Sequence, residues 1–169
     1  MPDRSPDALL LPELARSLRA LGAPHDAAEE SAHAAIFAPL LDARARATTG
    51  DVEVALSALR GEALAVRIEA RVTEAAQSGE TDAARARARA ARARELLAPM
   101  RHEMQALDAL AVPARAGGPT SESWQAWVAQ LRRVFAGADD ACRGLARLLS
   151  DPVSSPSTRR WFGGEGRER

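Results

Sequence analysis

The stretch that decides the fold is residues 79–111, which read GETDAARARARAARARELLAPMRHEMQALDALA. Small or apolar residues recur along it at steps that alternate between four and three, which is typical of a helix packed lengthwise against another helix. Alanine fills the first half of this seam, and leucine and methionine fill the second half, so a partner helix can approach most closely at the N-terminal end. The seam residues are Ala86, Ala90, Ala93, Leu97, Met100, Met104, Leu107 and Ala111.

The rest of the chain has the composition of an all-α protein. It has 169 residues, of which 46% are hydrophobic and only 4% aromatic, and this length suits a single domain. Residues with β-branched side chains are few and never alternate, so no strand is predicted. We therefore predict an antiparallel bundle of about five to six helices in residues 1–152, built on a long central αα-hairpin. Residues 153–169, rich in Ser, Pro, Gly and charge, are expected to form a flexible C-terminal tail.

Caps, prolines and glycines place the helix boundaries. Pro39 predicts a kink or break near Ala38, Pro99 interrupts the fourth helix, and residues 112–119 are predicted to form a loop. The third helix should be the most buried, because one face carries Val52, Leu56, Leu59, Ala63 and Val66 and a second carries Leu64, Ile68 and Val72. The predicted helices are 5–21, 26–47, 51–77, 81–111 (capped by Thr81 or Asp82), one that follows Thr120 or Ser121, and a last one that runs from a bend at Gly137 to Ser150.

Arginine supplies every basic side chain, and it is concentrated in one place. Residues 85–101 hold six arginines against Glu95 alone. Such a strip can follow a phosphate backbone, meet an acidic protein, or pair with Glu62, Glu69 and Glu74 on the neighbouring helix. The formal net charge of zero argues against a whole surface built for nucleic acid. The candidate contacts to a partner or to phosphate are Arg85, Arg89, Arg92, Arg94 and Arg101.

Residues that could carry chemistry are sparse. Glu30 and His33 have the three-residue spacing used in di-iron bundles, but Pro99 stands where His102 would need a matching glutamate. The single Cys142 is expected to pack in a helix rather than to act as a nucleophile. No spacing suggests a catalytic triad or a phosphate-binding glycine loop. We therefore predict no catalytic residue, no cofactor and no metal site.

The two ends of the sequence carry further signals. Leucines 9–11 are followed at once by Pro12, so no signal peptide is expected, and no apolar run approaches the roughly 20 residues that span a bilayer. We expect a soluble, cytoplasmic protein with no membrane contact. The tail holds two arginines followed by two aromatic residues, which predict an anchor on this bundle or on a partner. The candidate anchor is Arg159, Arg160, Trp161 and Phe162.

Short stretches between residues 58 and 131 carry a resemblance to a known family. They are Arg94-Glu95-Leu96, Leu97-Ala98-Pro99, residues 101–110, Pro119-Thr120-Ser121-Glu122 and Ala129-Gln130-Leu131. This layout resembles the bacterial proteasome activator family, whose members are small helical bundles that assemble into rings. The resemblance implies a ring-forming bundle. The family's C-terminal docking signature has no counterpart in residues 166–169, so proteasome activation itself is not implied. Leu145, Leu149 and Arg160-Trp161 also resemble small helical subunits of CRISPR effector complexes.

The sequence therefore favours a non-catalytic helical bundle that serves as a protein-interaction, scaffold or adaptor subunit of an oligomer or larger assembly. One alternative is a small helical subunit of a nucleoprotein complex that contacts nucleic acid through the arginine strip. A second alternative is a ring-forming protein of the proteasome-activator type. A metal-binding four-helix bundle is the most distant hypothesis.

Overall fold

The described part of the chain is built entirely from helices. The computed structural model describes residues 26–48 and 52–151, and it confirms the all-α prediction. None of the helices in these residues is long and apolar enough to cross a bilayer. The predicted helix 5–21 and the predicted tail lie outside the described residues. The helices are α2 (Ala27–Thr48), α3 (Val52–Ala58), α4 (Gly61–Gln77), α5 (Ala83–Leu96), α6 (Ala98–Gly117) and α7 (Glu122–Ser150).

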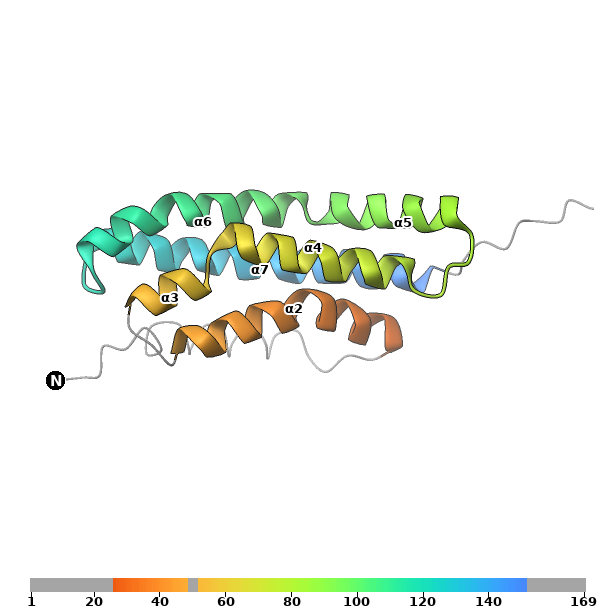
Figure 1. The fold of residues 1–169 in the computed structure, drawn as a ribbon, viewed down its shortest axis with the longest axis horizontal. Helices are drawn as coiled ribbons and strands as arrows, with labels where there is room; N and C mark the ends of the chain where they lie inside the picture. The colour runs from red at the N-terminus through yellow and green to blue at the C-terminus, as the bar shows by residue number, and fades with distance from the viewer. Residues whose placement is uncertain (1–25, 49–51, 152–169) are drawn as a thin grey trace, which may run out of the picture.

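The helices pack as four antiparallel rods. Helices α3 and α4 follow each other along one rod and α5 and α6 along another, while α2 and α7 each form a rod alone (Figure 1). Helix α2 packs against α4 and α7, and the α5–α6 rod packs against the same two helices from the other side. Successive rods run in opposite directions (Figure 1). This is the up-down-up-down topology of a four-helix bundle.

The seam predicted from residues 79–111 lies in the core. Ala90, Ala93 and the apolar residues from Leu97 to Leu107 on this seam are buried, and Ala86 and Ala111 at its ends are half-buried. The largest buried side chains facing the seam come from α7, where the Trp124 and Trp127 rings lie with their centroids 5.0 Å apart. Burial of a large apolar side chain stabilises the fold by about 1.5–3 kcal/mol. The heptad pattern therefore identified the central packing surface correctly.

The predicted third helix, 51–77, is wrong as one continuous element, because it breaks between Ala58 and Gly61. A Cβ atom at residue 61 would collide with the backbone carbonyl of Met104, so only glycine lets α4 approach α6 this closely. The Asp108 carboxylate on α6 accepts hydrogen bonds from the N–H of Gly61 at 2.7 Å and of Glu62 at 2.9 Å. Asp108 on α6 thus caps the N-terminus of α4. The side chain of Arg60, which occupies the N-cap position itself, makes no capping hydrogen bond.

This break also corrects the predicted apolar faces. After it, Leu64, Ile68 and Val72 point into the core, whereas Ala63 and Val66 are exposed, Val66 by 58%. The prediction that this segment is the most buried element is wrong as well. Helix α7 carries the longest series of buried side chains, from Trp124 to Leu148.

Proline affects the helices less than the sequence suggested. A kink or break was predicted near Ala38; the break does not occur, because α2 continues through Pro39. Packing of its neighbours Ile36, Phe37 and Leu40 outweighs the roughly 3 kcal/mol that an internal proline costs. The predicted loop 112–119 is also wrong over most of its length, since α6 continues through Pro113 to Gly117. Pro99 marks a true interruption, at the first turn of α6.

The capping predictions are confirmed. Asp82 begins α5 by accepting hydrogen bonds from the N–H groups of Ala84 and Arg85, and the bond from Arg85 is the main cause that lowers the pKa of this carboxyl. Ser121 begins α7 by accepting from Trp124, after a turn in which Gly118 has a φ of 76°. The expected bend at Gly137 does not divide the segment, because α7 is a single helix to Ser150.

Candidate interaction face on α5

Helix α5 holds most of the arginines predicted as contacts, at one end of the bundle. It packs against α4 and α7, and its remaining side points away from the bundle (Figure 1). Ala90 and Ala93 fix its rotation, because both are buried against these neighbours. The arginines therefore follow two rows on either side of the exposed surface, as the 3.6-residue repeat requires.

The first row runs along α7, and two of its three arginines contact other residues of the bundle. The Arg89 guanidinium donates to the carbonyl oxygen of Leu148 at 3.2 Å, near the C-terminal end of α7. A cation at this end of a helix also interacts favourably with the helix dipole. Arg85 lies 3.6 Å from the carboxylate of Glu80, whose side chain is only 2% exposed. Arg92, the third member of this row, is exposed.

The second row runs along α4. Arg101 pairs with Glu69 at 2.5 Å, so one of the three glutamates predicted as partners takes that role. The Arg87 side chain is exposed and donates to the carbonyl oxygen of Ala83 in its own helix. Arg94 is exposed, and within residues 26–48 and 52–151 neither it nor Arg92 makes an ion pair or hydrogen bond through its side chain. Three of the five candidate arginines thus have intramolecular partners, and Arg92 and Arg94 remain available.

Small exposed residues lie between the two rows. They follow the same alternation of four and three as the buried seam, but on the opposite side of the helix. Sequence reasoning missed this second series, although its spacing is visible once the buried register is known. The exposed crest consists of the small residues Ala84, Ala88 and Ala91 together with Glu95 on α5, and it continues to Ala98, the first residue of α6.

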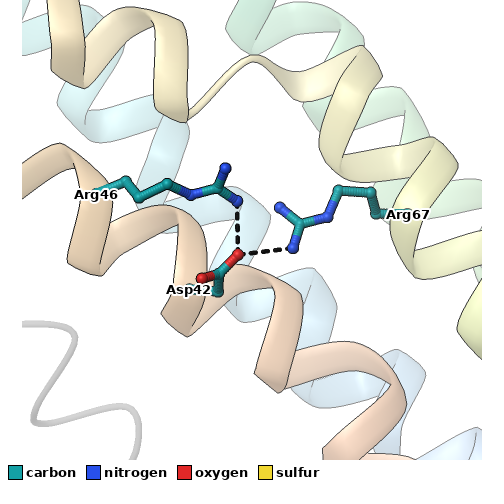
Figure 2. Close-up of polar contacts among 3 residues, drawn as sticks. All are labelled: Asp42, Arg46 and Arg67. Atoms are coloured by element: carbon teal, nitrogen blue, oxygen red, sulfur yellow. Dashed lines mark hydrogen bonds and ion pairs between the residues drawn. The ribbon is translucent and has the colours of Figure 1, made fainter.

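A second polar cluster joins α2 to α4 and was not predicted. One carboxylate oxygen of Asp42 accepts from Arg46 at 2.5 Å and from Arg67 at 2.7 Å, so the two guanidinium groups converge on it (Figure 2). The hydrogen bond from Arg67 is the main cause that lowers the pKa of Asp42, with Arg46 adding to it. All three side chains are about half exposed, and exposed pairs of this kind contribute little to the stability of a fold.

Next to this cluster lies an open groove between α3 and α4. Its volume is about 640 Å³, and Arg46, Arg67, Val54 and Leu64 are among the residues that line it. The i, i+4 spacing of Asp42 and Arg46 was visible in the sequence. The contribution of Arg67 was not, because it depends on how α4 packs against α2.

The side chains weighed for metal or nucleophilic chemistry lie apart. Glu30 is exposed, and His33 is half-buried with its ring 5.6 Å from that of Phe37. Among residues 26–48 and 52–151, no three His, Cys, Asp or Glu side chains gather in a group that could hold a metal ion. His102 is exposed on α6. Cys142 is buried, and burial raises the pKa of its thiol to about 12.

The candidate tail anchor, residues 159–162, lies outside the described residues. Comparisons of the chain with protein families, with curated proteins and with solved structures gave no match. The resemblance to the proteasome activators thus rests only on the short stretches quoted above.

Proposed function

We propose that this chain is a non-catalytic adaptor or scaffold subunit that binds another protein in the cytoplasm through the outer face of α5. The observation that carries the proposal is the outward position of Arg87, Arg92 and Arg94 on a helix whose opposite side is buried at Ala90 and Ala93. A surface with an excess of one sign of charge speeds association with an oppositely charged partner and selects against other partners.

The nucleic-acid hypothesis uses the same arginines, but the contacts support it less well. Arg85, Arg89 and Arg101 already have intramolecular partners, namely Glu80, the Leu148 carbonyl and Glu69. A phosphate-binding strip needs several cations along one line, because each neutralised phosphate contributes separately to affinity. Helix α5 also has no aromatic residue on which a base could stack.

The test is quantitative co-purification from the native host. The tagged chain and three single variants, Arg92→Glu, Arg94→Glu and Arg71→Glu, are compared by mass spectrometry. Arg71 is the matched control, since it is also exposed but lies on α4. We expect at least one protein whose recovery falls with Arg92→Glu and with Arg94→Glu and is unchanged with Arg71→Glu. Equal recovery of every co-purified protein with all three variants would contradict the proposal.

A further inference from the structure

We propose that the partner contributes an acidic amphipathic helix, which lies lengthwise along α5 with its glutamates or aspartates flanking its own apolar seam. The inference rests on the proposed function and identifies the chemistry of the partner. The occupant of this face is a separate protein. Three features of α5 lead to it: the charge of the face, the angle between the arginine rows, and the small residues between them.

The charge of the face is strongly positive. Residues 83–96 contain five arginines and one acidic residue, Glu95. The side chains of Arg92 and Arg94 are exposed and have no carboxylate partner within the described ranges, 26–48 and 52–151. Their charge is therefore available to pair with an incoming carboxylate, and Arg87 adds a third exposed cation.

The angle between the rows favours a helix as the ligand. Arg92 and Arg94 are two residues apart, so they project from α5 about 160° apart around its axis. A single phosphate backbone following one row leaves the other row unused. A helix lying on the crest places one of its flanks beside each row, as charged residues flank the seam of a coiled coil.

The crest permits close approach between the two helices. Ala84, Ala88, Ala91 and Ala98 are exposed and add little bulk between the backbones. With such residues, the axes of two packed helices lie near the lower end of the usual range of about 8–10 Å. Glu95 is the acidic exception on the crest. Since like charges repel, Glu95 favours a partner helix whose carboxylates lie beside the partner's apolar seam over one whose carboxylates lie on that seam.

A second copy of the same face is a poor occupant. Pairing α5 with α5 across a twofold axis would bring the arginine rows of both copies together, and like charges at an interface are destabilising. The occupant must therefore present the opposite charge. An amphipathic helix with acidic flanks satisfies both the charge and the geometry.

The experiment uses synthetic helical peptides as probes for the full chain, with binding measured by fluorescence anisotropy. The acidic probe has an alanine and leucine seam flanked by glutamate on both sides. A shuffled probe has the same composition without the seam, and a basic probe has lysine in place of each glutamate. A labelled oligonucleotide of equal charge to the acidic probe is measured in parallel, and light scattering reports self-association.

We expect the acidic probe to bind more tightly than the shuffled probe, and more weakly as salt rises, because the Debye length falls below about 10 Å above 0.1 M. Arg92→Glu and Arg94→Glu should each weaken binding by about threefold to tenfold, whereas Arg71→Glu should leave it unchanged. The double variant Arg92→Glu/Arg94→Glu leaves three arginines and three glutamates in residues 83–96, so it should no longer distinguish the acidic probe from the basic probe. Thermal melting verifies that each variant is folded.

Each of the following results would overturn the inference: no binding of the acidic probe, equal binding of the shuffled probe, or tighter binding of the oligonucleotide that the same variants abolish. Self-association that Arg92→Glu and Arg94→Glu abolish would identify a second copy as the occupant instead. The proposed function is judged separately, because co-purification that depends on Arg92 and Arg94 would support it even if no acidic helix binds. If the acidic probe does not bind and co-purification does not depend on Arg92 and Arg94, both proposals are refuted.

Discussion

Replacing Asp108 by alanine should strongly destabilise the bundle, because this carboxylate on α6 caps the N-terminus of α4. It accepts two backbone hydrogen bonds, from Gly61 at 2.7 Å and Glu62 at 2.9 Å, and the side chain of Arg60 offers no substitute cap. A hydrogen bond to a charged group contributes about 1.5–3 kcal/mol, and loss of an N-cap costs about 0.5–2 kcal/mol. Since both bonds share one half-buried carboxylate, we expect a loss of about 2–3 kcal/mol in the free energy of unfolding.

The assay is urea denaturation followed by far-ultraviolet circular dichroism, in which the midpoint and slope give the free energy of unfolding. Asp108→Asn is the comparison variant, because its single amide oxygen can accept only one of the two backbone hydrogen bonds and carries no charge, so it should lose a large part of the stability that Asp108→Ala loses. If Asp108→Ala unfolds within about 0.5 kcal/mol of the wild type, the cap is energetically unimportant and the reasoning is refuted.

Three further outcomes are expected. Leu97→Ala and Leu107→Ala should each lower the free energy of unfolding by about 2–5 kcal/mol in the same denaturation assay, because both residues are buried on the seam; losses below about 0.5 kcal/mol for both would mean that the seam is not the core. Asp82→Ala should lower the melting temperature at neutral pH. The difference in melting temperature between the variant and the wild type should narrow as the pH falls below the ordinary carboxyl pKa of about 3.9, because a carboxyl whose pKa is lowered by folding stabilises only while it is ionised. A difference in melting temperature that does not change with pH would contradict this. Cys142 should not react with Ellman's reagent at pH 8 until urea is added, since the thiol is buried and its pKa is raised to about 12; rapid reaction of the folded protein would show that the thiol is accessible.

Local sequence signals predicted the elements that depend on local interactions. The seam of residues 79–111, the cap at Asp82, the cap at Ser121 and the interruption at Pro99 all depend on residues within one or two helical turns of each other. These features follow from helix periodicity and from unsatisfied backbone groups at helix ends. Proline and glycine signals were less reliable, because buried neighbours hold α2 together across Pro39.

The rest could not be predicted, because it depends on contacts between distant residues. Gly61 and Asp108 are 47 positions apart, and only their meeting explains why the third predicted helix breaks. The arginine strip was located from the sequence, but its division into structural and available arginines needed the packing of α5 against α7 and the ion pair between Arg101 and Glu69. The exposed crest also required the rotation of α5 to be known.

The most direct test of the central claim is site-specific photocrosslinking in the native host. A photoreactive amino acid replaces Ala88, at the centre of the crest, or Ala129, an exposed alanine on α7 that serves as the control. We expect a specific covalent adduct with another protein from position 88 and none from position 129. Adducts from position 129 alone, or from neither position, would contradict the assignment of α5 as the interaction face.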